Sequence, residues 1–320
     1  MNGFNVINYI TPTTLYGLGG SITYGMSADA GLDWLSLLEL YHNKHDQQQY
    51  IKTNKGSPST GSWYGCVRLQ ADIIANIPTI VYLEFAVNDG DNDRDKGCAE
   101  AIIRRIWTAL PLTKLCCVFF PKVTDKDVDD ATNLNDAMKQ NWIALCAHYG
   151  IQYVDYADYL KSVIDAGGTL ADYMADGAHP TNAGHALANE IIKSGSSSPL
   201  SGALPARLVA DSEDFENDPL IVNGVDRDSI TGTWTEDGTD LVSSEANATI
   251  TFSGTFRCFG LDVVDYGSVF SWNIDGGDFV EKATPGYSNQ IIYTGTTREP
   301  HIVIIKVVSG TVNIKRFLAI

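Results

Sequence analysis

The chain has 320 residues, which is long enough for two domains that each bury a core. Hydrophobic residues make up 44% of it and charged residues 19%, a composition that excludes a disordered chain. The formal net charge of -17 repels the phosphates of nucleic acids and anionic lipid surfaces. We therefore expect no nucleic acid and no membrane among the partners of this protein.

Neither a signal peptide nor a membrane span is visible in the sequence. Residues 1–10 lack a basic segment followed by an apolar one, and no stretch approaches the roughly twenty apolar residues that cross a bilayer. The localisation therefore stays open between the cytoplasm and export with loss of a leader. The cysteines show no metal-ligand spacing and are expected to be reduced and buried: Cys66, Cys98, Cys116, Cys117, Cys146 and Cys258.

Strand-like and helix-like segments alternate between residues 16 and 192. The run at residues 79–87 is almost entirely apolar, which indicates a strand covered on both faces, as in a parallel sheet. The alternation predicts a doubly wound α/β sheet. Its strands after the first are expected at residues 50–53, 79–87, 115–120 and 153–155.

The pattern changes after a stretch rich in Gly, Ser and Pro at residues 195–204, which predicts a linker. Beyond it, strand-like runs such as residues 248–252 and 301–308 are separated by turn signals such as Ser253-Gly254. These spacings are typical of a β-sandwich. We therefore expect an α/β domain in residues 1–200 and an all-β domain in residues 201–320.

The stretch Tyr16–Gly25 takes an apolar run directly into a glycine pair and then into Ser21. Glycine tolerates the angles of a tight turn between a strand and a helix, and the open first turn of a helix leaves N–H groups free to face negative charge. Ser21 is therefore a candidate nucleophile. A plain Gly-Ser turn is the alternative for this stretch taken alone.

A serine nucleophile needs a base within hydrogen-bond reach and a carboxylate that orients this base. Asp176 and His179 lie three residues apart, so a single turn supplies both. His185 is a rival base, but it falls within the predicted last helix and has no acidic neighbour at comparable spacing. The sequence therefore favours His179.

Acyl transfer also needs hydrogen-bond donors for the oxyanion of the tetrahedral intermediate. The Ser21 N–H, the Asn88 side-chain amide and a backbone N–H of residues 56–61 are candidates. Each follows the carboxyl end of a predicted strand, the edge at which open parallel sheets bind ligands. A plain Asn-Asp-Gly turn is the alternative for Asn88.

Four segments, in order, resemble the four sequence blocks of the SGNH (GDSL-like) hydrolases: residues 20–23, 54–59, 86–89 and 176–180. The resemblance covers about residues 13–193 and implies a flavodoxin-like α/β fold that requires no metal or organic cofactor. It implies that Ser21 is the nucleophile, His179 the base and Asp176 the acid that orients it. It further implies an oxyanion hole formed by Ser21, Ser59 and Asn88.

The chain departs from this family's pattern at three positions. Gly20 stands where the family name has Asp, and Ala86 stands where the third block usually has Gly. The second block normally offers a glycine N–H, and counting from Asn54 that place is Ser59. Gly56 and Gly61 are the alternatives for this donor.

Two further motifs allow both a functional and a structural interpretation. Trp63 and Tyr64 are candidates for a sugar-stacking platform, although aromatic residues at a helix start more often belong to the core. A cluster of acidic residues imitates a calcium loop, but Arg94 stands where such loops need Gly, which favours a solvated loop without metal. The cluster comprises Asp89, Asp91, Asp93, Asp95 and Glu100.

About residues 206–320 resemble, more loosely, the jelly-roll modules of carbohydrate-active enzymes, through segments such as Thr233-Trp234 and Trp272-Asn273. This implies a module that binds sugar or only packs. Together the two resemblances predict a serine esterase that removes acetyl or other small acyl groups from a carbohydrate. The alternatives are a lipid, aryl-ester or thioester hydrolase of the same family and a non-catalytic carbohydrate-binding protein on a hydrolase scaffold. The oligomeric state is not indicated.

Overall fold

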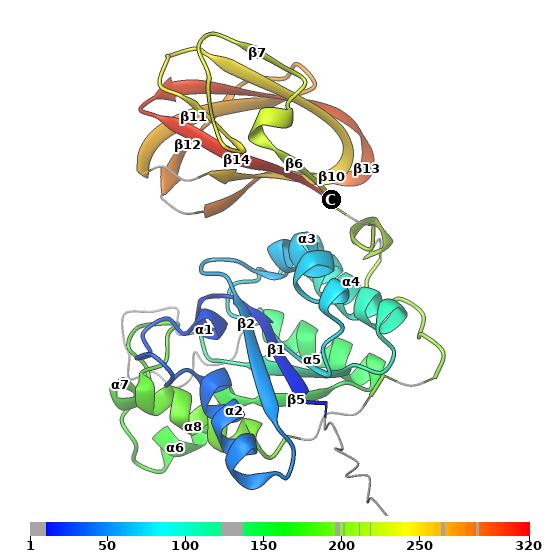
Figure 1. The fold of residues 1–320 in the computed structure, drawn as a ribbon, viewed down its shortest axis with the longest axis vertical. Coiled ribbons are helices and arrows are strands. Elements are labelled where there is room, and N and C mark those ends of the chain that lie inside the picture. The colour runs from blue at the N-terminus through cyan, green and yellow to red at the C-terminus, as the bar shows by residue number, and fades with distance from the viewer. Residues whose placement is uncertain are drawn as a thin grey trace, which may run out of the picture. The chain divides into compact units, whose positions relative to one another are not determined.

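The computed structural model divides into two compact units, Met1–Ala210 and Asp211–Ile320, and each is described by itself. It describes residues 11–122, 137–195, 199–200, 202–210, 212–217, 219–263, 266–285 and 288–320. Figure 1 shows that the first unit combines helices and strands, whereas the second consists mainly of strands.

The first unit is built on a parallel sheet with the strand order β2-β1-β3-β4-β5. This is the flavodoxin-like order, so the predicted doubly wound α/β fold is confirmed. The chain runs from β1 outward to β2 and then returns past β1 to β3, and ligands of such sheets bind at this switch point. The strands are β1 (Thr13–Gly19), β2 (Tyr50–Gly56), β3 (Ile80–Glu84), β4 (Lys114–Phe119) and β5 (Gln152–Asp155).

Helices cover both faces of this sheet (Figure 1). One face carries α2 (Trp34–His45), α6 (Tyr156–Asp165) and α8 (Asn182–Ile192). The other carries α3 (Ser62–Asp72), α4 (Asp93–Ala109) and α5 (Ala137–Tyr149). Three short helices lie in connections: α1 (Ser21–Tyr24), the 3-10 helix η1 (Ile74–Asn76) and α7 (Leu170–Tyr173). None of the helices in the described ranges is long and apolar enough to cross a membrane.

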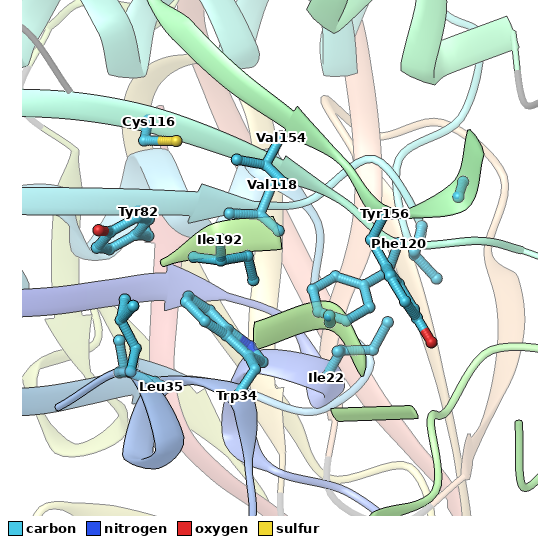
Figure 2. Close-up of a cluster of buried hydrophobic side chains, with 14 of the residues drawn as sticks. Ile22, Trp34, Leu35, Tyr82, Cys116, Val118, Phe120, Val154, Tyr156 and Ile192 are labelled. Carbon is cyan, nitrogen blue, oxygen red and sulfur yellow. The ribbon is translucent and has the colours of Figure 1, made fainter. Parts of the chain in front are cut away.

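An apolar core fills the space between the sheet and the helices α2, α6 and α8, as Figure 2 shows in part. Trp34 of α2 lies edge-on to Tyr82 of β3, with 5.7 Å between ring centroids. Ile192 of α8 belongs to the same cluster. Full burial of one large apolar side chain stabilises a fold by about 1.5–3 kcal/mol. This core therefore holds β1 and β3 in place beneath the loops that carry the candidate site.

The first unit extends past the predicted linker. Pro199 pairs with Lys114 of β4, and the Pro205 carbonyl accepts a hydrogen bond of 2.7 Å from Arg104 Nη1 of α4. Residues 196–198 and 201 of the predicted linker lie outside the described residues. The division between the units falls after Ala210.

The second unit is an antiparallel sheet with the order β12-β11-β13-β10-β14-β9-β8, in which β6 also pairs with β14 and β7 with β10. One end of β10 pairs with β7 and its other end with β14, and its pairing with β13 shifts register between these two ends. This separate all-β unit confirms the predicted second fold and is consistent with a jelly roll. Its elements are η3 (Ser212–Phe215), β6 (Leu220–Asn223), η4 (Gly224–Asp226), β7 (Ser229–Thr231), β8 (Thr235–Asp237), β9 (Asp240–Ser243), β10 (Thr249–Val263), β11 (Tyr266–Ile274), β12 (Val280–Pro285), β13 (Ser288–Ser309) and β14 (Val312–Ala319).

All six cysteines are buried, which confirms the expectation that they pack in the interior. Cys116 and Cys117 lie on β4, in the interior of the first unit. They act there as small apolar side chains.

We expect Leu18→Ala to lower the free energy of unfolding of the first unit by about 2–5 kcal/mol, because Leu18 of β1 is fully buried. Leu40→Ala is the matched control, since Leu40 of α2 is 63% exposed and should change stability by less than about 0.5 kcal/mol. Urea denaturation of both variants measures the difference. Equal midpoints would contradict the assignment of β1 to the core.

Candidate active site

Ser21 lies where β1 ends and α1 begins. β1 ends at Gly19, and Gly20 connects it to Ser21, the first residue of α1. A Cβ atom at Gly19 would lie 2.6 Å from the Glu84 carbonyl oxygen, and one at Gly20 would lie 2.2 Å from Asn88 Nδ2. The Glu84 backbone therefore requires glycine at position 19, whereas a side chain at position 20 would displace the Asn88 amide.

The structure brings Ser21, His179 and Asp176 together in one chain of hydrogen bonds. Ser21 Oγ lies 2.8 Å from His179 Nε2. His179 Nδ1 lies 2.7 Å from Asp176 Oδ2. The sequence separates Ser21 from His179 by 158 positions, so the fold alone creates this contact.

A short loop between α7 and α8 presents Asp176 and His179. Asp176 Oδ1 accepts hydrogen bonds from the backbone N–H groups of Ala178 and His179, at 2.8 and 2.7 Å. Met174 and Pro180 pair across the base of this loop. The relative positions of Asp176 and His179 are therefore set within one local turn.

The electrostatics of this loop define the state of the imidazole. Burial raises the pKa of Asp176, but hydrogen bonds from His179 and from the Ala178 N–H outweigh this effect, and the net pKa lies below the usual 3.8. Asp176 is therefore ionised near neutral pH and accepts a hydrogen bond from Nδ1–H of His179. This leaves His179 Nε2 as the acceptor for the Ser21 hydroxyl proton.

His185, the rival base in the sequence, is fully buried in α8. Its Nδ1 accepts a hydrogen bond of 3.3 Å from the Trp34 N–H at the start of α2. Burial lowers the pKa of His185 to about 4, so the imidazole is neutral near pH 7. His185 therefore joins α8 to α2, while His179 contacts Ser21.

Asn88 stands beside the Ser21 turn, as expected of an oxyanion donor. It is exposed, and its Nδ2 donates a hydrogen bond of 3.1 Å to the Thr60 carbonyl. An amide nitrogen carries two hydrogens, so one remains for a ligand. The same nitrogen adjoins Gly20. Asn88 thus links the loop after β2 to the turn that carries Ser21.

Ser59 has a φ of 59°, in the left-handed region that favours glycine. This explains in physical terms why a glycine suits this place in the second block. Ser59 is exposed, and the next residue, Thr60, is the one that Asn88 contacts. The role of the Ser59 N–H as an oxyanion donor stays a prediction.

The acidic residues of the calcium-like motif do not converge on one point. Asp89 is buried and accepts hydrogen bonds from the Ser62 N–H at 2.6 Å and from Trp142 Nε1 at 3.0 Å. Glu100 instead accepts from the N–H groups of Leu208 and Val209. Within the described part of the chain, no group of three or more His, Cys, Asp or Glu side chains is arranged to hold a metal ion.

Trp63 is 3% exposed, so it cannot serve as a surface for sugar stacking. Tyr64 is partly buried, and the Arg68 guanidinium lies 5.4 Å from its ring centroid. The core interpretation therefore fits Trp63.

The second unit holds a His–Asp pair of its own, which sequence reasoning missed because the two residues are 26 positions apart. His301 Nδ1 lies 2.7 Å from Asp275 Oδ2. His301 Nε2 is buried and has no hydrogen-bond partner among the described residues. This pair therefore lacks the contact with a serine hydroxyl that distinguishes His179.

Sequence reasoning also missed Glu84 and Arg68, which contact the turn before Ser21. Glu84 Oε2 accepts a hydrogen bond of 3.2 Å from the Gly20 N–H, and Arg68 Nη2 donates one of 2.9 Å to the Gly19 carbonyl. The available signal was the single charged residue within the apolar run at residues 79–87.

Comparisons with known proteins place these residues in a family context. The model of the GDSL-like lipase/acylhydrolase family matches residues 18–187. Comparison with curated proteins gives no match. Among solved structures, a two-domain esterase (CEX) active on acetylated mannans matches with a TM-score of 0.79 and 18% identity, over 96% of this chain and 91% of its own.

Two further solved structures are similar. The two-domain esterase co-crystallised with mannopentaose gives a TM-score of 0.77 at 18% identity, over 96% of this chain and 90% of that one. Axe2, an acetylxylan esterase from Geobacillus stearothermophilus, gives 0.46 at 17% identity, over 57% of this chain and 93% of its own. The likeness to the two-domain esterase establishes a shared fold across both units.

We expect Asn88→Ala to lower kcat for a small acetyl ester by about 10²–10³-fold with little change in KM, because it removes an oxyanion donor. Gly20→Ala should lower kcat in the same direction, since the added Cβ displaces the Asn88 amide. Asn217→Ala, at an exposed position of the second unit, is the control. Steady-state kinetics that leave kcat of Asn88→Ala at the wild-type value would contradict this assignment.

We expect Ser59→Gly to keep kcat and to raise the free energy of unfolding by up to about 1 kcal/mol, because glycine keeps the N–H and removes the left-handed strain. Ser57→Gly is the matched control, since Ser57 is not among the residues with positive φ and should lose stability. Thermal unfolding and kcat are measured together. A fall in kcat for Ser59→Gly would assign the contribution to the hydroxyl instead.

Proposed function

The chain belongs to the GDSL-like lipase/acylhydrolase family and is a carboxylic ester hydrolase, and we propose that it removes acetyl or other small acyl groups from a carbohydrate. In this proposal Ser21 is the nucleophile, His179 the base and Asp176 the acid that orients the base. The oxyanion hole consists of Ser21, Asn88 and Ser59.

One observation carries the catalytic part of the proposal: the unbroken hydrogen-bond chain from Ser21 through His179 to Asp176, with distances of 2.8 and 2.7 Å. These are the distances that a base needs to take a hydroxyl proton and that a carboxylate needs to orient an imidazole. All three residues lie on segments that resemble the blocks of the family.

The reaction proceeds in two steps. Ser21 Oγ attacks the ester carbonyl as His179 Nε2 takes its proton, and the ionised Asp176 stabilises the imidazolium that forms. The oxyanion receives hydrogen bonds from the Ser21 N–H, the Asn88 amide and the Ser59 N–H. His179 then gives the proton to the leaving alcohol. Water, activated by the same imidazole, releases the acid from the acyl enzyme and restores Ser21.

The proposed substrate class rests on two features besides the hydrogen-bond chain from Ser21 to Asp176. The fold is shared over both units with an esterase described as active on acetylated mannans. The formal net charge of -17 disfavours approach to anionic lipid surfaces, whereas a neutral acylated glycan meets no such repulsion. A lipid, aryl-ester or thioester hydrolase would use the same Ser21, His179 and Asp176, and would differ only in the acyl and leaving groups of its substrate.

We expect Ser21→Ala to lower ester hydrolysis by about 10⁴-fold or more, since the acyl enzyme can no longer form. Ser162→Ala is the matched control, because Ser162 is exposed on α6 and has no contact with His179. The assay compares acetate release from acetylated mannan and xylan oligosaccharides with cleavage of p-nitrophenyl acetate and of long-chain p-nitrophenyl esters. Activity that survives in Ser21→Ala would refute the triad.

The same panel separates the alternatives. Preference for acetylated oligosaccharides supports the proposed substrate class, whereas preference for long-chain esters points to a lipid hydrolase. A wild-type protein that releases acid from none of these esters, while it binds the oligosaccharides in a calorimeter, would favour the non-catalytic carbohydrate-binding protein.

A further inference from the structure

The peptide group between Gly19 and Gly20, directly before Ser21, is held at both ends by ionisable side chains. The Gly19 carbonyl accepts hydrogen bonds from the Ser57 N–H at 3.0 Å and from Arg68 Nη2 at 2.9 Å. The Gly20 N–H donates to the carbonyl oxygen of Glu84 at 3.1 Å and to its carboxylate at 3.2 Å. A cation thus binds the carbonyl and a carboxylate binds the N–H of the same planar unit.

The Glu84 carboxylate also binds residues on both sides of Ser21 in the chain. Its Oε2 accepts hydrogen bonds from the Thr23 N–H at 3.2 Å and from Thr23 Oγ1 at 3.0 Å, besides that from Gly20. Gly20 and Thr23 lie on the two sides of Ser21 in the chain. One carboxylate oxygen therefore joins the residue before the nucleophile to the first turn of α1 after it.

Arg68 acts from the opposite side, on α3. Its Nη1 bonds to the Lys55 carbonyl near the end of β2 and to Asp72 Oδ2 on its own helix. Because Nη2 bonds to the Gly19 carbonyl, Arg68 joins the carboxyl ends of β1 and β2. Asp89, another buried carboxyl at this edge, bonds to Ser62 and Trp142 instead of the turn.

Two consecutive glycines leave the backbone before Ser21 with unusual freedom, because neither carries a side chain that would restrict it. The restraint must therefore come from outside the turn. Reaction rates depend on placing the nucleophile and the oxyanion donors within about 0.5 Å of the productive geometry, so restraint at this point bears directly on catalysis.

We infer that Glu84 and Arg68 are positioning residues, which fix the Gly19–Gly20 peptide and thereby orient the Ser21 hydroxyl and N–H for acyl transfer. This inference rests on the proposed function of Ser21. Neither side chain takes part in a covalent step. Glu84 acts through the N–H groups of Gly20 and Thr23, and Arg68 acts through the Gly19 carbonyl.

Glu84→Gln, Arg68→Gln and the control Glu100→Gln test this inference. Glu100 is an equally buried carboxyl that accepts two backbone N–H groups, but at Leu208 and Val209, outside the site. We expect Glu84→Gln and Arg68→Gln to lower kcat for p-nitrophenyl acetate by about 10–100-fold with little change in KM. Covalent labelling of Ser21 by a fluorophosphonate should slow in parallel. Glu100→Gln should change neither rate.

The pH profile distinguishes a positioning role from a merely structural one. Burial raises the pKa of Glu84 to about 7, so its carboxylate is lost as the pH falls through that value. Loss of the Glu84 carboxylate weakens its hydrogen bonds with the N–H groups of Gly20 and Thr23, so kcat/KM of the wild type falls as the pH drops through about 7. We expect Glu84→Gln to lose the part of this acid limb that Glu84 causes.

The stability of Glu84→Gln moves in the opposite direction to its activity. Because the pKa of Glu84 in the fold exceeds the usual 4.5, the protonated form stabilises the fold, and this contribution is lost as the pH rises through about 7. The melting temperature of Glu84→Gln minus that of wild type should therefore be larger at pH 8 than at pH 5. A lower kcat without a lower melting temperature at pH 8 is the expected signature.

Three results would overturn the inference. Wild-type kcat and an unchanged acid limb in folded Glu84→Gln would exclude a positioning role while leaving the esterase proposal intact. If Glu84→Gln does not fold, wild-type kcat and labelling rate in Arg68→Gln would exclude it. A wild-type protein that neither hydrolyses p-nitrophenyl acetate nor reacts with the fluorophosphonate at Ser21 would overturn the proposed function and this inference together.

Discussion

The turn from β1 into α1 is the constraint on which the candidate site depends. A buried strand that must present a serine at its carboxyl end has only Gly19 and Gly20 in which to change direction, and both are crowded by Glu84 and Asn88. The flavodoxin-like order places β2 and β3 on the two sides of β1, so the loops after all three strands meet at this turn. The sheet topology therefore decides which residues reach Ser21.

Asp176 and His179 are positioned in a different way. Asp176 and His179 lie on one short loop whose own N–H groups bind Asp176, so their mutual geometry needs little from the sheet. The sheet and its helices place this loop within hydrogen-bond distance of Ser21. The cap of α8 by Thr181 and the buried contact of His185 with α2 anchor the loop at its end. The hydrogen-bond chain from Asp176 to Ser21 thus combines a local motif with one long-range contact.

The sequence predicts the parts of the site that depend on local pattern and misses those that depend on distant partners. Ser21 after two glycines, and Asp176 three residues before His179, are recognisable because spacing alone defines them. Glu84 is not, because the N–H groups that it binds lie 64 and 61 residues away. Likewise, the breaker-rich stretch near residue 200 predicts a linker, but Arg104 binds the carbonyl of Pro205 and draws it onto the first unit.

At the carboxyl end of β3, neighbouring residues in the sequence make long-range contacts with two different helices. Glu84, Asn88 and Asp89 follow one another there within six residues of sequence. Glu84 binds N–H groups around the start of α1, and Asp89 binds the Ser62 N–H at the start of α3. Burial raises the pKa of both carboxyls, to about 7 and about 8, so each is held at a cost in stability near neutral pH. The two carboxyls therefore hold the starts of α1 and α3 at this edge of the sheet, beside Ser21 and Asn88, at a cost in stability.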